Sequence, residues 1–208
     1  MTTQQTDQPH ESRRKLLDAA LQVIRSRGYA GTRVDDVCAA AGLTKGSFFH
    51  HFDSKEELAI AAAAHFSAKA DARFAQAPYQ QAQDPVDRVL GYVDFRSAIA
   101  TGDLAQVSCL LGTMVQEAYR THPAIREACE AHIGDHAATV AQDIEAAQAQ
   151  NVPDAPWRSD SMALFTQAVL QGAFVLAKAK QDPAVVADCL AHLRRYLAHE
   201  LRPRATAD

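Results

Sequence analysis

The sequence predicts an all-α protein, and three observations support that fold class. Apolar residues recur at the helical spacings of 3 and 4, and no stretch alternates apolar and polar residues as a half-buried strand does. Alanine, which has the highest helix propensity, is abundant. Hydrophobic residues make up 48% and charged residues 22% of the 208 residues, which is enough apolar material for a core. This length fits one compact domain with a small accessory, or two small domains.

Composition also excludes several classes of protein. No apolar run approaches the roughly 20 residues that span a bilayer, and Met1 to Ser12 is too polar for a signal peptide. The four cysteines form no CxxC pair, which argues against a disulfide scaffold or a zinc ribbon. We therefore expect a reduced, cytoplasmic chain. With a net charge of −4, any binding to nucleic acid must depend on a local surface.

The N-terminal segment divides into short helices. We expect a disordered tail over residues 1–11 and then a helix from Ser12 that ends at Gly28, because a residue after the last turn often adopts the left-handed conformation. A second helix follows Thr32, which forms with Asp35 a pattern that resembles a capping arrangement.

A glycine-containing turn separates this second helix from a third. Gly42 supplies a positive φ in the turn, and Thr44 caps the third helix, which covers residues 45–51. A capping box at residues 54–57 opens a fourth helix. Three helices with such a turn between the second and third form a helix-turn-helix, a motif whose second short helix enters the major groove of DNA.

The rest of the chain is predicted to be helical with short breaks. Apolar periodicity, together with glycine and proline breaks, predicts helices over residues 55–76, 85–102, 107–121, 123–150, 159–180 and 183–199, with a loop at 151–156. The expected organisation is therefore a helix-turn-helix DNA-binding domain over 12–58 and a larger helical domain over 59–208.

A resemblance to a known family begins in the same N-terminal segment. Residues 32–58, TRVDDVCAAAGLTKGSFFHHFDSKEEL, and the preceding Gly28-Tyr29 resemble the DNA-binding domain of the TetR family of transcriptional regulators. The resemblance implies that residues 59–208 bind a ligand and that the last two long helices form a four-helix bundle with a second subunit. The apolar residues expected at that interface are Leu164, Val169, Leu170, Leu176, Leu190, Leu193 and Leu197.

The predicted recognition helix has two faces. Leu43, Phe48 and Phe52 are expected to pack inward. The residues expected at DNA are Thr44, Lys45, Gly46, Ser47, Phe49, His50 and His51, and Thr32 and Lys55 are expected to cap neighbouring helices where N–H groups also face phosphate. Family members usually have Tyr where Phe49 stands, so the resemblance implies contact with a sugar or a thymine methyl instead of a hydrogen bond. The alternative is a helical motif in a protein interface.

Cysteine and histidine at helical spacing raise the possibility of a metal site. Cys129, His132 and His136 share one helix face and could bind zinc or copper if a fourth ligand came from elsewhere. The simpler interpretation is a partly solvated polar face, and we predict no metal and no cofactor. Neighbouring His50 and His51 point about 100° apart on a helix and cannot easily share one ion.

An effector pocket is expected in the larger domain, because aromatic and Met side chains there suit an apolar cavity between helices. The expected pocket residues are Phe95, Cys109, Met114, Phe165, Phe174 and Lys178. The segments around Cys109 and Lys178 are similar to those of TetR-family repressors that respond to electrophiles and oxidants, in which a cysteine and a lysine at corresponding places lie near each other. The resemblance implies that the ammonium of Lys178 would lower the pKa of the Cys109 thiol and so raise its reactivity. Alternatively, Cys109 is a small buried hydrophobe and the aromatic residues belong to the core.

These observations predict a homodimeric transcriptional regulator. It would be a repressor that a small molecule or a cysteine modification releases from a palindromic operator. The rival is an α-helical enzyme with an apolar substrate pocket, but no Gly-rich phosphate loop, HExxH or GxSxG motif occurs. A dimerisation module that binds no DNA would leave residues 28–58 unexplained.

Overall fold

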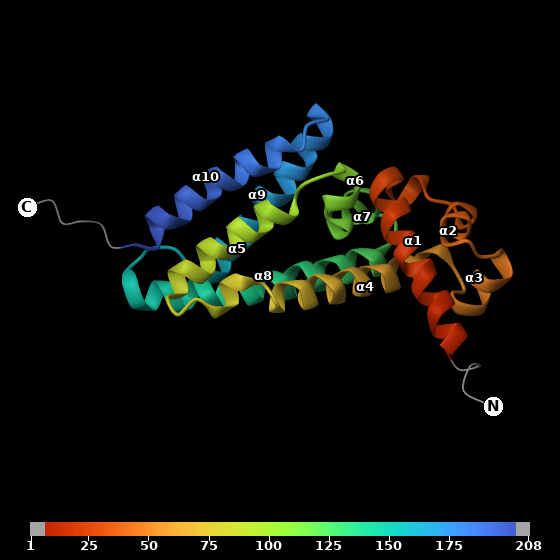
Figure 1. The fold of residues 1–208 in the computed structure, drawn as a ribbon, viewed down its shortest axis with the longest axis horizontal. Coiled ribbons are helices and arrows are strands. Elements are labelled where there is room, and N and C mark those ends of the chain that lie inside the picture. Colours follow the sequence, from red (N-terminus) through yellow and green to blue (C-terminus); the bar gives the residue numbers. More distant parts are fainter. Residues whose placement is uncertain (1–6, 203–208) are drawn as a thin grey trace, which may run out of the picture. The chain divides into compact units, whose positions relative to one another are not determined.

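The computed structural model describes residues 7–202, and within that range it is helical with no strand, which confirms the predicted fold class (Figure 1). The elements in chain order are α1 (Asp7–Gly31), α2 (Val34–Ala41), α3 (Lys45–His51), α4 (Lys55–Ala75), the 3₁₀ helix η1 (Pro78–Gln81), α5 (Pro85–Ile99), α6 (Leu104–Val107), α7 (Leu110–Ala118), α8 (Pro123–Asn151), α9 (Ser159–Lys180) and α10 (Ala184–Glu200).

The chain forms two compact units, which are discontinuous in sequence. The first unit contains Met1–Ala70 and Ser108–His132, and the second contains Asp71–Val107 and Ile133–Asp208. In the first unit α1 packs against α2, α3 and α7. The helix-turn-helix segment therefore shares its core with α7, which comes from the middle of the sequence.

The core of the first unit follows from helical periodicity. Leu16, Ala20 and Ile24 are four residues apart, and all three are fully buried on α1. Phe48 on α3 is also fully buried. Truncating a buried phenylalanine to alanine typically costs about 3–5 kcal/mol, so this side chain anchors the short α3.

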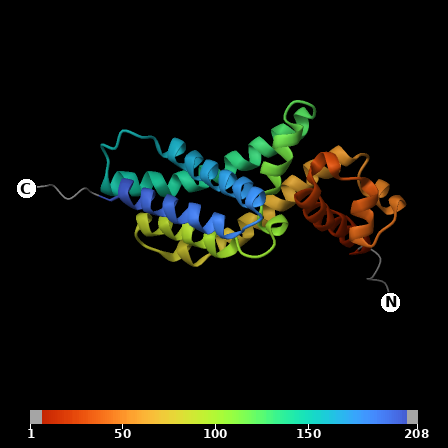
Figure 2. The ribbon, with the colours of Figure 1, turned by 90° about the horizontal axis from the view of Figure 1, so that it is seen from above.

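The second unit is a bundle in which α10 packs against both α9 and α5 (Figures 1 and 2). Leu190, Leu193 and Leu197 form the buried face of α10. The chain also packs α5 against η1 and α6 against α9. This unit contains the candidate ligand cavities described below.

Several predicted boundaries were wrong. The helix predicted over 85–102 ends at Ile99. Residues 7–11 belong to α1 instead of a disordered tail, and residues 1–6 of that tail lie outside the described residues. Residues 107–121 were predicted as one helix, but α6 ends at Val107 and α7 begins at Leu110. The break occurs because Cys109 has an extended backbone, with φ −72° and ψ 122°, and its Sγ accepts a hydrogen bond from the Gly112 N–H at 3.5 Å.

Helix α9 is apolar enough to depart from the prediction that no segment could span a bilayer. An 18-residue window in it has a mean hydropathy of 1.4, so by length and composition alone it could cross a membrane. Within the second unit, 44% of that window is buried. The core helix of a bundle can have the same length and hydropathy, and α9 packs against α10 in this one.

Candidate nucleic-acid interface and ligand cavities

Local hydrogen bonds build the connection from α2 to α3. The Arg33 N–H donates to Asp36 Oδ2 at 3.1 Å, and this bond lowers the pKa of the Asp36 carboxyl. Gly42 ends α2 with φ 64°, in the left-handed conformation that the sequence predicted. Thr44 Oγ1 then accepts from the Ser47 N–H at 3.2 Å and so caps α3. The chemistry of the turn therefore sets the start of the recognition helix.

The inner face of α3 is aromatic. Phe48 and Phe52 are buried, as predicted, with their ring centroids 5.7 Å apart, whereas Leu43 is half-buried. The Arg13 guanidinium of α1 lies 5.2 Å from the centre of the Phe52 ring. These contacts fix the rotation of α3 about its own axis and so determine which residues face outward.

The outer face of α3 is exposed. Phe49 has 56% of its surface accessible, and Lys45, Gly46 and His50 are exposed beside it. Lys45 Nζ lies 2.8 Å from Asp35 Oδ1, and this hydrogen bond raises the pKa of the Lys45 ammonium. A Cβ added to Gly46 would meet only Thr44 Oγ1, at 3.7 Å, so the space before it is open.

Besides Lys45, three of the residues predicted at DNA bind other parts of the protein. Thr32 is buried, and its Oγ1 donates to the Gly28 carbonyl at 2.6 Å; the N-cap of α2 is Arg33, so the predicted cap was wrong. The Lys55 ammonium donates to the Thr32 carbonyl at 3.1 Å. His51 Nε2 lies 2.6 Å from the Ser12 hydroxyl, and burial lowers its pKa.

A contact between α1 and α7 was not predicted. Gly28 has φ 78° and ψ 165°, which interrupts α1. Glu117 Oε2 on α7 accepts from the Ala30 N–H at 2.7 Å, and a Cβ on Gly28 would overlap Glu117 Oε1. The glycine was predicted to end a helix, but no local signal indicates which residue approaches it.

The six predicted pocket residues are divided between the two units. Cys109 and Met114 lie in the first, and Phe95, Phe165, Phe174 and Lys178 lie in the second. Cys109 is half-buried at the start of α7, whereas Met114 is fully buried. Phe165 is exposed and its ring lies 5.3 Å from that of Tyr196. None of the six lines either cavity described next.

One cavity of about 270 Å³ lies in the second unit and is rich in aromatic residues. We call it the aromatic cavity. Its lining consists of Asp71, Phe74, Ala75, Tyr79, Gln80, Val89, Tyr92, His136, Thr139, Val140, Gln142 and Asp143. The Tyr92 hydroxyl is 3.0 Å from His136 Nε2 and also receives hydrogen bonds from Arg96 Nε at 3.2 Å and Gln167 Nε2 at 3.0 Å.

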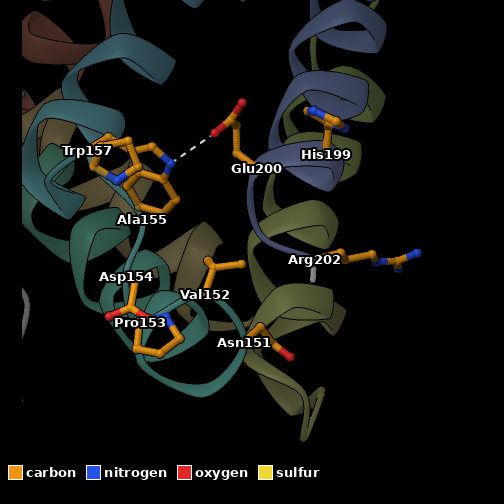
Figure 3. Close-up of a pocket in the computed structure, with 10 residues that line it drawn as sticks. Asn151, Val152, Pro153, Asp154, Ala155, Trp157, His199, Glu200 and Arg202 are labelled. Atoms are coloured by element: carbon orange, nitrogen blue, oxygen red, sulfur yellow. Dashed lines mark hydrogen bonds between the residues drawn. The ribbon is translucent and has the colours of Figure 1, made fainter. Parts of the chain in front are cut away.

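A second cavity of about 410 Å³ lies beside the loop between α8 and α9 (Figure 3). Residues 151–157 line one side, with His199 and Glu200 from the end of α10 and Arg202 just after it. Figure 3 shows the hydrogen bond from Trp157 Nε1 to Glu200 Oε2, which is 2.9 Å long. This bond ties the loop to α10.

The residues considered for a metal site form no such group. Within residues 7–202, no three His, Cys, Asp or Glu side chains are arranged to hold an ion. Burial raises the pKa of the Cys129 thiol to about 12. Burial also lowers the pKa of His136 to about 4, with a smaller contribution from Arg96, and its Nε2 is engaged by Tyr92.

The last two helices have both buried and exposed apolar side chains. Leu170, Leu190, Leu193 and Leu197, all expected at a subunit interface, are buried within the second unit. Their assignment to an exposed interface was wrong, because the same periodicity serves the packing of α10 on α9 and α5. Val169 is half-buried. The exposed apolar residues, which we call the α9–α10 patch, are Leu164, Phe165, Val175, Leu176 and Tyr196.

Comparisons with known proteins agree with this architecture. Residues 16–62 match the family model of bacterial regulatory proteins, tetR family, and residues 85–193 match that of the tetracyclin repressor-like C-terminal domain. The HTH-type transcriptional regulator CymR of Pseudomonas putida is 47% identical over 57 residues, covering 27% of this chain and 28% of that relative. The HTH-type transcriptional repressor DhaR of Mycobacterium sp. is 33% identical over 105 residues, covering 50% of this chain and 51% of that relative.

Solved structures are similar over nearly the whole chain. A TetR transcriptional regulator from Chloroflexus aurantiacus is 27% identical with a TM-score of 0.83, and the match covers 96% of this chain and 100% of that one. A TetR-family regulator from Agrobacterium tumefaciens has the same fold at 19% identity and a TM-score of 0.79, with 90% and 98% covered. The chain belongs to the TetR family of bacterial regulatory proteins.

Proposed function

We propose that this chain is a sequence-specific transcriptional repressor that binds a near-palindromic operator as a homodimer. The exposed face of α3 is the observation that best supports this function. Lys45, Gly46, Phe49 and His50 face outward from a helix that buried aromatic residues hold in place. A recognition helix in the major groove needs this combination of a fixed inner face and an accessible outer face.

The nine predicted DNA-binding residues then take different roles. Lys45 exchanges its exposed partner Asp35 for a base edge or a phosphate, and His50 also supplies a hydrogen bond there. Phe49 supplies van der Waals contact with a sugar or a thymine methyl. Gly46 permits close approach, and Thr44 and Ser47 form the cap at the end of α3 that faces the DNA. Thr32, His51 and Lys55 act by holding the motif together, because their polar atoms bind within the protein.

The α9–α10 patch supports dimerisation through the last two helices. Leu176 is 52% exposed, and the patch also contains an aromatic pair, Phe165 and Tyr196. Exposed apolar surface of this kind marks protein–protein contacts. Two subunits joined there would present two copies of α3 to two half-sites, which is why we expect a near-palindrome.

Release from DNA requires an effector that binds one state of the dimer more tightly than the other. We propose that the effector is a small molecule bound in the second unit or an electrophile that modifies Cys109. The family consists of regulators, which favours this function over an α-helical enzyme. A regulator that binds chromosomal DNA would act in the cytoplasm.

Selection of binding sites from random duplex DNA tests the DNA-binding function. The dimer should enrich a two-fold symmetric sequence, and Lys45→Ala and His50→Ala should each weaken binding to it by about 1–3 kcal/mol if they contact bases. Lys180→Ala and His132→Ala, which remove the same residue types outside the helix-turn-helix, serve as matched controls. Wild-type affinity in both α3 variants would refute the assignment of α3.

A further inference from the structure

We propose that the aromatic cavity is the effector site and that its ligand is a neutral aromatic molecule of one or two rings with a hydrogen-bond acceptor. The effector role rests on the proposed function, whereas the ligand class follows from the cavity itself. Three features define that class: the volume of the cavity, its aromatic walls, and a hydrogen-bond donor among residues with few available charges.

The volume sets the size of the ligand. The cavity measures about 270 Å³. A closed apolar cavity of roughly 150 Å³ in another protein binds benzene, so this one has room for two fused rings. Phe74, Val89, Tyr92 and Val140 are buried and form its floor, whereas Thr139 is exposed at its rim.

The walls favour a flat, aromatic ligand. The Phe74 ring lies 4.9 Å from the His136 ring and 5.8 Å from the Tyr92 ring, and Tyr79 meets Tyr92 edge-on at 6.0 Å. Aromatic groups stabilise one another in offset or edge-to-face arrangements beyond the burial of their area. Four rings from α4, η1, α5 and α8 therefore surround the site.

The hydrogen bonds of Tyr92 define the polar group of the site. Its hydroxyl oxygen accepts from Arg96 Nε and Gln167 Nε2, so its single proton is left for His136 Nε2, 3.0 Å away. The imidazole is then neutral with its proton on Nδ1, which agrees with a pKa lowered to about 4 by burial. Nδ1–H has no acceptor among residues 7–202 and can donate to a carbonyl or ether oxygen of a ligand.

The charges around the cavity disfavour an ionic ligand. The lining contains the Asp71 and Asp143 carboxylates and no lysine or arginine. Arg88 pairs with Asp143 at 2.7 Å, and the Arg96 guanidinium lies 4.9 Å from the Phe74 ring centre. An anion would meet the unpaired Asp71 carboxylate. A cation could pair only with Asp71, which is exposed, and would meet the His136 N–H and the Arg96 guanidinium beside Tyr92. A neutral ligand does not have to bury a charge, so it avoids the free-energy cost of desolvation that an anion or a cation would meet here.

Three probes of one shape test the ligand class: 2-acetylnaphthalene, 2-ethylnaphthalene and 2-naphthoate. Titration calorimetry on the full chain should show that the ketone binds about three- to tenfold more tightly than the hydrocarbon, which is the net value of one hydrogen bond. The carboxylate should bind most weakly. Equal or tighter binding of 2-naphthoate would overturn the proposal.

Paired variants on α8 locate the binding. His136→Phe should remove the preference for the ketone, whereas His132→Phe, one turn away and outside the lining, should keep it. Thr139→Trp should block all three probes at the rim, whereas Ala138→Trp, exposed and outside the lining, should leave binding intact. Thermal unfolding confirms that each variant folds. Wild-type binding by Thr139→Trp or an intact ketone preference in His136→Phe would refute the site.

A third measurement separates the cavity from the DNA-binding function. Added 2-acetylnaphthalene should weaken binding of the wild-type dimer to its selected DNA but leave Thr139→Trp unaffected. Unchanged DNA affinity with a saturated cavity would overturn the effector role while DNA binding stood. If no DNA were selected at all, the proposed repressor function would be refuted, and the calorimetric titrations would still test the ligand class independently.

Discussion

Replacing Gly28 with alanine tests how α1 is joined to α7. The backbone at Gly28, with φ 78° and ψ 165°, lies in a region that is essentially restricted to glycine. A Cβ there would also overlap Glu117 Oε1. The carboxylate would have to move away, and the hydrogen bond from the Ala30 N–H to Glu117 Oε2 would be lost.

The two costs can be estimated separately. Strain in this backbone region costs about 1–3 kcal/mol, and loss of the Glu117 hydrogen bond costs about 1 kcal/mol. Gly28→Ala should therefore lower the free energy of unfolding by about 3 kcal/mol. In a Glu117→Ala background the hydrogen bond is already gone, so the cost should fall to about 2 kcal/mol. Gly42→Ala, with φ 64° and nothing within 4 Å of its Cβ, should cost about 1–2 kcal/mol.

Urea denaturation followed by circular dichroism measures these differences, with the protein concentration held constant because the proposed dimerisation would contribute to stability. Two results would refute the reasoning. One is a Gly28→Ala variant no less stable than Gly42→Ala. The other is a cost of Gly28→Ala that is the same with and without Glu117, which would show that the carboxylate does not determine it.

Three further predictions follow from burial and hydrogen bonding. Lowering the pH from about 8 to about 5 should reduce the free energy of unfolding of wild type by roughly 2 kcal/mol more than that of His136→Gln. The reason is that the His136 ring binds a proton with a pKa of 6.5 in the unfolded chain but only with a pKa of about 4 in the folded chain. Identical pH profiles of urea unfolding for the two proteins would contradict this. Leu176→Asp should give folded monomers in sedimentation, because the Leu176 side chain is exposed. Leu193→Asp should unfold, because the Leu193 side chain is only 3% exposed and a carboxylate there would be buried. A dimeric Leu176→Asp would place the interface elsewhere. In Cys109→Ser the serine hydroxyl should still cap α7, but N-ethylmaleimide should no longer release the protein from DNA. The control variant Cys189→Ser should still be released. Equal release of wild type and Cys109→Ser would remove Cys109 from the response.

Features set by neighbouring residues could be predicted from the sequence. The bounds of α9 agree with the prediction, and Gly42 and Thr44 have the predicted roles in the turn. Ser54 Oγ accepts from the Glu57 N–H at 3.0 Å, as its capping pattern indicated. Each of these features depends on residues within one helical turn of one another, so the chemistry of a short segment is sufficient.

Features that depend on distant partners could not be predicted. The rings around the aromatic cavity come from four elements, and His136 drew attention only as a metal ligand because of its spacing from Cys129 and His132. Periodicity shows that Leu193 faces a partner but does not distinguish a helix of the same chain from one of a second subunit. Thr32 lies beside a helix start, and only the fold shows that its hydroxyl bonds to Gly28.

In the first unit, the segment that follows α7 meets the helix-turn-helix through contacts that converge on Tyr29 of α1. The Tyr29 ring meets the His122 ring edge-on at 5.0 Å, and the Lys55 ammonium lies 4.3 Å from the centre of the Tyr29 ring. Lys55 Nζ also donates to the Tyr29 carbonyl at 3.1 Å, and Lys55 is the first residue of α4, which follows α3 after a short loop. A shift of the segment between α7 and α8, which contains His122, would therefore disturb α1 and the start of α4 together. Such contiguity becomes allosteric coupling only if these contacts have two arrangements with different DNA affinities, and the effector must distinguish between them.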